Sequence, residues 1–95
     1  VTTFQSRFGP EEWLKPYTVK EVARLAKEGK KKIAVIAPAF SSDCIETLEE
    51  INEEIKESFE NAGGENFLYI PCLNDSPNHI SSLLGIIEEN LVGWL

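Results

Sequence analysis

The stretch IAVIAPAFSSDCIETL, residues 33–48, decides the fold of this chain. It begins with Ile33 to Ala37, a short apolar run that is rich in β-branched residues and bounded by lysines and a proline. Such a run is typical of a strand that is buried on both faces, as in a parallel sheet, and Pro38 ends it. The residues from Ser41 to Asp43 all favour the N-cap position, and Glu46 completes an arrangement close to a capping box. The stretch therefore predicts a strand, a loop and a helix in direct succession.

The helix predicted from about residue 43 to 61 is strongly acidic, because it holds eight of the sixteen acids of the chain. Its apolar residues recur at helical spacing on one side, at positions 45, 48, 51, 55 and 59. Two rows of glutamates at four-residue spacing lie away from that side: Glu46, Glu50 and Glu54, and Glu49, Glu53 and Glu57. Like charges this close destabilise a helix unless a cation compensates them.

Two interpretations of the glutamate rows stay open on periodicity alone. Rows of charge are usually the solvated face of an amphipathic helix. Alternatively, the carboxylates hold a divalent cation or pass protons, because oxygen ligands suit hard cations and crowded carboxylates raise one another's pKa. The second interpretation is favoured for Asp43 and Glu46, which follow the C-terminal end of a predicted parallel strand. Open α/β sheets place their ligands at that end.

The rest of the chain completes an alternating pattern of strands and helices. We expect a strand over residues 1–6, a loop over 7–16, a helix over 18–28, a strand over 67–70 and a helix over about 77–92. The pattern predicts a three-stranded parallel sheet with helices on its faces, which is half of a Rossmann-like layout.

Details of the two outer helices are also expected. Thr18 and Glu21 predict a capping box for the first, and Gly29 predicts its end. Pro77 predicts the first turn of the last helix, in which His79 is expected as a surface or capping residue. Its inward side is expected to consist of Ile80, Leu83, Leu84, Ile87 and Leu91.

Length and composition exclude several classes of protein. Ninety-five residues make one small domain, and the net charge of −7 argues against nucleic-acid binding. The single basic cluster, Lys30 to Lys32, is expected to be a solvated loop. No apolar run approaches the roughly 20 residues that span a membrane. The two cysteines, Cys44 and Cys72, are too few for an iron–sulfur cluster and suggest no disulfide scaffold. Because the chain has no methionine and begins within an expected strand, we expect a fragment or an excised domain.

Three segments resemble the ferrochelatase family in its order and at plausible spacing. They are FQSRFGPEEWLKPYT at residues 4–18, FSSDCIETLEE at 40–50 and YIPCLNDSPNHI at 69–80. The resemblance implies the C-terminal part of a bacterial-type cytoplasmic enzyme that inserts ferrous iron into protoporphyrin IX, forming protohaem in the terminal step of haem biosynthesis. It also implies a three-layer α/β, chelatase-like fold with a short parallel sheet flanked by helices.

The resemblance limits what this chain can do alone. The family's full enzyme is longer, and its catalytic histidine lies in the part that is absent here, so residues 1–95 are expected to form an inactive half-domain. No cofactor is expected on this chain, and ferrous iron is a substrate. Peripheral membrane association of the parent and self-association of the fragment through apolar surface are compatible with this picture.

The resemblance assigns roles to acidic residues. Glu46 matches the essential glutamate of the family's ETL motif and is expected to be catalytic, in metal delivery or proton removal together with the absent histidine. Asp43, Glu50 and Glu54 are expected to join Glu46 in binding the metal ion or lining its path. The start of this helix is expected to widen into a π-type turn that brings several acids to one side.

Four further residues are expected on the substrate side. The resemblance implies that Trp13 and Phe40 form part of the porphyrin pocket, since flat aromatic side chains suit a flat apolar macrocycle. Arg7 is left with two alternatives, a porphyrin propionate or a structural carboxylate. Cys44 stands where some members have histidine; it is either a packed free thiol or a ligand that alters metal preference.

Other functions stay open beside this one. A cobalt chelatase of related fold is a neighbouring alternative, because metal identity is weakly encoded in sequence. From another class, a non-catalytic acidic α/β module would bind a partner or divalent cations. The FQSR, WL and DCIET segments favour the enzyme, because a generic module needs neither Trp13 nor Glu46 in these contexts.

Overall fold

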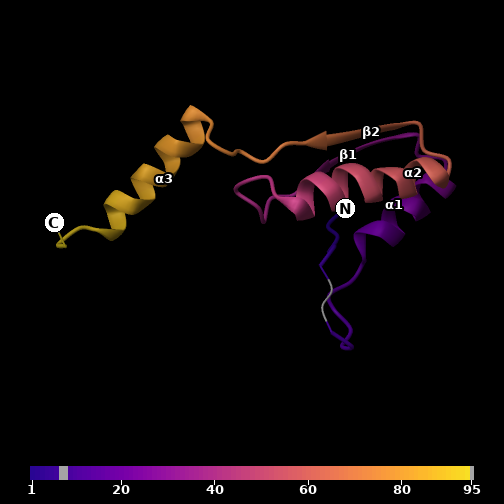
Figure 1. The fold of residues 1–95 in the computed structure, drawn as a ribbon, viewed down its shortest axis with the longest axis horizontal. Coiled ribbons are helices and arrows are strands. Elements are labelled where there is room, and N and C mark those ends of the chain that lie inside the picture. Colours follow the sequence, from indigo (N-terminus) through magenta and orange to yellow (C-terminus); the bar gives the residue numbers. More distant parts are fainter. Residues whose placement is uncertain (7–8, 95) are drawn as a thin grey trace.

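The computed structural model describes residues 1–6 and 9–94 as a short parallel sheet with helices. Strands β1 (Lys32–Ile36) and β2 (Asn66–Ile70) pair in parallel, with Lys32 opposite Asn66 and Ile36 opposite Ile70. The helices are α1 (Thr18–Lys27), the π-helix η1 (Glu46–Ile55), its continuation α2 (Lys56–Asn61) and α3 (Pro77–Asn90). Figure 1 shows α1 and the η1–α2 helix on one side of the sheet. The expected α/β class and the predicted elements at β1, β2 and the acidic helix are confirmed.

The hydrophobic core lies between the sheet and these helices. Its buried residues are Val22, Ala26, Ile51, Ile55, Phe59 and Tyr69. The Phe59 side chain is fully buried, and its ring centroid lies 6.1 Å from that of Phe67. Gly64 passes so close that a Cβ atom there would overlap the Phe59 ring. The core thus joins α1, the acidic helix and β2 into one packed body.

The other face of the sheet is exposed, which corrects the expectation of a strand buried on both faces. Alternate side chains of β1 point to opposite faces, and Ile33 and Val35 pack against the core. On the opposite face, Ile36 and Leu68 are each 61% exposed. In the part of the chain that the structure describes, no helix covers this face, so the sheet is flanked on one side.

The expectation of a third strand over residues 1–6 is also wrong. The sheet has two strands, and Phe4 forms only an isolated bridge with Tyr17. The Phe4 N–H donates to the Pro16 carbonyl oxygen at 2.9 Å, and the Thr18 N–H donates to that of Phe4 at 3.1 Å. Because these backbone groups pair with Pro16 and with the first residue of α1, they are not available to the sheet edge.

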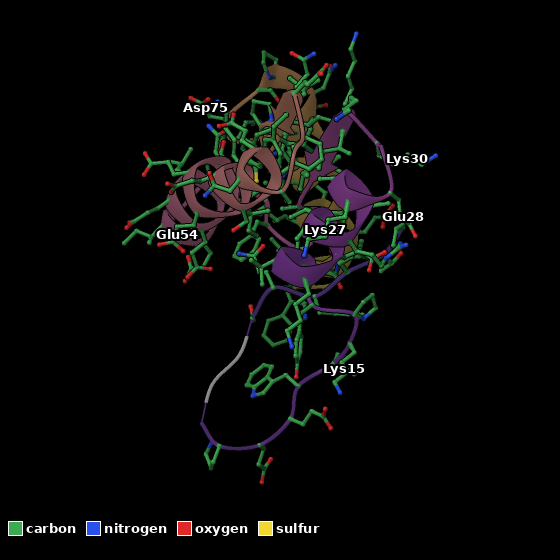
Figure 2. All side chains as sticks on the ribbon, turned by 90° about the vertical axis from the view of Figure 1, so that its right-hand side faces the viewer. Lys15, Lys27, Glu28, Lys30, Glu54 and Asp75 are labelled. Carbon is green, nitrogen blue, oxygen red and sulfur yellow. The ribbon has the colours of Figure 1, made fainter. Side chains whose placement is uncertain are left out.

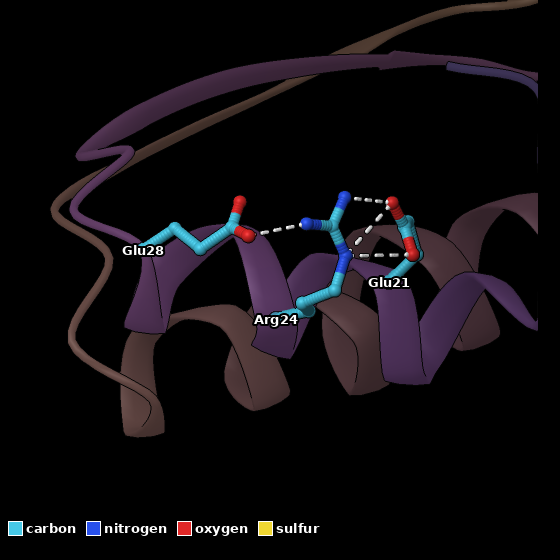
Figure 3. Close-up of polar contacts among 3 residues, drawn as sticks. All are labelled: Glu21, Arg24 and Glu28. Atoms are coloured by element: carbon cyan, nitrogen blue, oxygen red, sulfur yellow. Dashed lines mark hydrogen bonds and ion pairs between the residues drawn. The ribbon is translucent and has the colours of Figure 1, made fainter.

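Helix α1 has the predicted extent but lacks the predicted capping box. Tyr17 is its N-cap residue, and no side chain caps it. Thr18 Oγ1 instead shares a 2.7 Å hydrogen bond with Thr3 Oγ1. Glu21 is engaged by Arg24, which also donates to Glu28 at 2.6 Å (Figure 3). The capping box fails because both of its side chains have other partners.

Helix α3 begins at Pro77 as predicted but extends away from the packed body (Figure 1). The residues expected on its inward side are all exposed, from 37% to 53%: Ile80, Leu83, Leu84, Ile87 and Leu91. Among the described residues no element packs along this helix, and this is why the expectation is wrong. His79 is buried rather than on the surface, with Nδ1 2.5 Å from the Asn74 carbonyl oxygen. No helix among the described residues is long and apolar enough to cross a membrane.

Candidate active site

The acidic helix begins as a π-helix, as the resemblance implied. Its hydrogen bonds run from i to i+5, so each turn holds more residues than an α-helical turn. The buried side chains of η1 are Thr47, Ile51 and Ile55. Ile45 and Leu48, which α-helical spacing predicted on the apolar side, are 69% and 52% exposed, because the wider winding changes which residues face the core.

One of the two glutamate rows borders a cleft. Glu46, Glu50 and Glu54 each precede a buried residue of η1 by one position, and together they line a cleft of about 450 Å³. Its other lining residues are Gln5, Ser6, Tyr17, Thr18, Val19 and Ile55. The second row of glutamates is exposed and does not line this cleft. The wider helix therefore separates three cleft carboxylates from three solvated ones.

The cleft carboxylates have no cationic partner among the residues that the structure describes. Among the described residues, no ion pair reaches Glu46, Glu50 or Glu54. Figure 2 shows Glu54 on the other side of the body from the labelled Lys27 and Lys30. A row of uncompensated carboxylates attracts cations from solution.

Gln5 ties the N-terminal segment to this row. Its Nε2 donates to the Glu46 carbonyl oxygen at 2.8 Å and to Glu50 Oε2 at 3.1 Å. Sequence analysis did not single out Gln5, although it belongs to the FQSR segment that carries the resemblance. Its two hydrogen bonds fix the distance between the N-terminal segment and the first turn of η1.

An apolar pocket of about 370 Å³ adjoins the cleft. Trp13 and Phe40, which were expected to share a pocket, both line it, and Trp13 is 42% exposed. Its other apolar lining residues include Phe4, Leu14, Val35, Ile36, Ala37 and Ile51. Gln5, Ser6 and Thr18 line both the pocket and the cleft. An apolar surface and a row of carboxylates are therefore neighbours at the end of β1.

Asp43 is separate from the row and lies in a hydrogen-bond network. Its Oδ1 accepts hydrogen bonds from Tyr69 Oη at 2.6 Å and Thr47 Oγ1 at 2.9 Å, and its Oδ2 accepts one from Asn74 Nδ2 at 2.8 Å. The bonds from Tyr69 and Asn74 hold the pKa of Asp43 well below its usual value. Burial and the bond to Asp43 raise the pKa of Tyr69. Sequence analysis did not identify these partners. Tyr69 and Asn74 are distant from Asp43 in the sequence, and Thr47 was not singled out within the acidic helix.

The expected ligands do not form a preassembled metal site. In residues 1–6 and 9–94, no three His, Cys, Asp or Glu side chains converge to hold a metal ion. Glu46, Glu50 and Glu54 share the cleft, whereas Asp43 is not among its lining residues. Spaced carboxylates of this kind can bind a hydrated cation loosely in succession.

Two substrate-side expectations remain. Cys44 is half-buried and its thiol is free. A hydrogen bond from Cys44, aided by a backbone hydrogen bond, holds the pKa of Glu46 below its usual value, which is opposite to the rise that crowded carboxylates predict. Arg7 lies outside the described residues.

Comparison with known proteins gives one consistent family. The model of the family described as Ferrochelatase matches residues 1–91. The chain is 69% identical over 94 residues to a ferrochelatase of Rhodobacter capsulatus, a match that covers 99% of this chain and 27% of that protein. It is 62% identical over 93 residues to one of Rhizobium meliloti (strain 1021), with 98% and 27% covered. It is 57% identical over 94 residues to one of Marinobacter nauticus, with 99% and 25% covered. The chain thus spans about a quarter of the length of these curated relatives.

Proposed function

Since the chain belongs to the ferrochelatase family, we propose that it supplies the acidic wall of an active site that inserts ferrous iron into protoporphyrin IX, forming protohaem. One observation carries this proposal: an apolar pocket with three aromatic side chains adjoins a cleft lined by three carboxylates. Porphyrin metallation needs both surfaces, because the macrocycle is flat and apolar while the metal arrives as a hydrated cation.

The apolar pocket is the proposed porphyrin side. Trp13 and Phe40 offer aromatic surface to one part of the macrocycle. Since the pocket holds only part of such a ring, the remainder of the ring would lie against a wall that this chain does not supply. Residues 1–95 thus act as the C-terminal half-domain, and alone they are inactive.

The carboxylate cleft is the proposed metal side. Iron insertion releases two pyrrole protons and strips water from the metal, so each step needs an acceptor or a ligand. Glu46 is the proposed catalytic residue, with Glu50 and Glu54 forming the approach for the cation and Asp43 supporting the first turn. Glu46 would take part in metal delivery or proton removal, together with a histidine that this chain does not contain.

Further properties of the parent protein complete the proposal. It would be cytoplasmic, with peripheral association to the membrane that holds its apolar substrate. The exposed apolar residues of α3 and of the outer sheet face would favour self-association of this chain when it is isolated.

One observation favours a second candidate within the same class. Cys44 lies beside Glu46, and a thiol suits softer or borderline metals than a carboxylate does. Cobalt insertion is therefore the alternative substrate choice. A non-catalytic acidic module is a weaker alternative, because it does not account for an apolar pocket beside the carboxylates.

The test uses a chimera in which this chain replaces the matching segment of the Rhodobacter capsulatus protein. Metallation of protoporphyrin IX is followed by loss of porphyrin fluorescence, with ferrous and cobaltous ions in separate reactions. We expect iron insertion by the chimera and none by its Glu46→Gln variant. Glu53→Gln is the matched control, since it makes the same change in the solvated row. Equal activity of the Glu46→Gln variant and the chimera would refute the role of Glu46, and faster cobalt insertion would favour the alternative metal.

A further inference from the structure

The loop between β2 and α3 is tied to the start of the acidic helix by one residue. Asn74 Nδ2 donates to Asp43 Oδ2 at 2.8 Å, and the Asp43 backbone N–H donates to Asn74 Oδ1 at 2.8 Å. The Asn74 backbone N–H donates to the Ser41 carbonyl oxygen at 2.9 Å. These three hydrogen bonds join segments that lie more than thirty residues apart. Side chain and backbone of Asn74 thus both hold the residues that precede η1.

Asn74 is itself held from both sides. Its Nδ2 also donates to the Cys72 carbonyl oxygen at 3.0 Å, just after β2. Its carbonyl oxygen lies 2.5 Å from Nδ1 of the buried His79, in the first turn of α3. Its φ of 52° is left-handed, a conformation that asparagine tolerates better than most residues. Because the loop is anchored at β2 and α3, its amide reaches Asp43 from a fixed position.

The network continues from Asp43 into the first turn of η1. Thr47 Oγ1 donates to Asp43 Oδ1 at 2.9 Å and accepts the Cys44 backbone N–H at 2.9 Å. Thr47 is fully buried, so its side chain has little freedom to follow another arrangement. Glu46 lies within this closed turn, directly before Thr47. The direction in which its carboxylate leaves the backbone therefore depends on where Asp43 is held.

We propose that Asn74 is a positioning residue: by holding Asp43, it sets the first turn of η1 and so places the Glu46 carboxylate in the cleft that adjoins the apolar pocket. This inference rests on the proposed function. Asn74 touches neither the pocket nor the cleft and acts only through the Asp43–Thr47 turn. A displacement of a catalytic group by about 1 Å can cost a hundredfold in rate, so the effect is large enough to measure.

The test compares Asn74→Gly with Asn78→Gly in the chimera described above. Glycine tolerates the left-handed backbone at position 74, so Asn74→Gly removes the side-chain hydrogen bonds without forcing the loop to refold. Asn78 is exposed in the first turn of α3, and its replacement is the matched control. Two quantities are measured: steady-state metallation, and amide hydrogen exchange of residues 44–48 and of β1.

We expect Asn74→Gly to lower kcat by about tenfold or more while KM for the porphyrin stays within about twofold, because the apolar pocket is unchanged. Exchange of residues 44–48 should accelerate by about tenfold, whereas β1 keeps its rate. Asn78→Gly should change neither. Unchanged exchange at residues 44–48, or unchanged kcat, would overturn the inference. If the parent chimera is inactive, the proposed function fails, and exchange alone then decides whether Asn74 holds the turn.

Discussion

Replacing Gly64 by alanine should destabilise the packed body, although the change adds only one methyl group. Gly64 follows α2, where its Cα faces the ring of Phe59, and an added Cβ would overlap three atoms of that ring. The ring cannot turn away, because Phe59 is fully buried between the helices and β2. Overpacking of this kind typically costs about 1–3 kcal/mol.

The assay is urea denaturation of the chain followed by far-UV circular dichroism. With a slope of about 1–3 kcal/mol per molar urea for a small protein, the expected loss lowers the midpoint by roughly 1 M at constant slope. Gly85→Ala is the matched control, because a Cβ there meets nothing and alanine is about 1 kcal/mol better than glycine inside a helix. The same substitution should therefore lower the midpoint at position 64 and not lower it at position 85.

A third variant tests the cause. Phe59→Leu shortens the side chain that the new methyl group would strike, so Gly64→Ala should cost less in that background than in the original chain. Equal costs in both backgrounds, or a midpoint for Gly64→Ala at or above that of the original chain, would refute the close packing of Gly64 against Phe59.

Two further predictions concern the polar groups around the site. Tyr69→Phe removes the largest cause that lowers the pKa of Asp43. A lowered acid pKa stabilises fully above the unfolded value of about 4, and this stabilisation is lost as the pH falls toward the folded value. The urea midpoint should therefore fall at pH 7, and this deficit should shrink progressively below about pH 4. A deficit that stays constant down to the acid range would contradict that assignment. Gln5→Glu sets a carboxylate against Glu50 in place of a donor, so metallation by the chimera should slow, and a slowing that weakens at high ionic strength would identify repulsion as the reason.

The local pattern of the sequence was sufficient for the elements that carry the site. The apolar run of β1 and the polar residues that follow it predict a strand, a turn and a helix within one short stretch, and these elements are confirmed. The predicted capping by Ser41 to Asp43 and Glu46 is wrong, because Ile45 is the N-cap residue of η1 and no side chain caps it. The resemblance added the π-helical winding, which no periodicity argument gives, since Ile45 and Leu48 fit α-helical spacing and are nevertheless exposed.

The features that were predicted wrongly or missed depend on contacts between segments that are distant in the sequence. Residues 1–6 have strand composition, but the Phe4 backbone pairs with Pro16 and Thr18, and this pairing excludes the sheet. Helix α3 has a regular apolar side, yet amphipathicity does not determine which surface covers it. The hydrogen bonds of Asp43 could not be predicted from local pattern either, because its partner Asn74 lies 31 residues away in the sequence.

The parallel pairing of β1 and β2 has a consequence for how this region is synthesised. Each residue of β1 pairs with a residue of β2 that lies thirty-four positions later in the chain, and the acidic helix lies in the connection between the two strands. A parallel pair of this kind cannot close until the whole crossover has emerged from the ribosome, because the second strand is made last. During that interval β1 offers an unpaired backbone edge and an apolar run to its surroundings. The three lysines at the start of β1, Lys30 to Lys32, and the acids after the strand are charged groups of the kind that keep such an edge from pairing with another nascent chain.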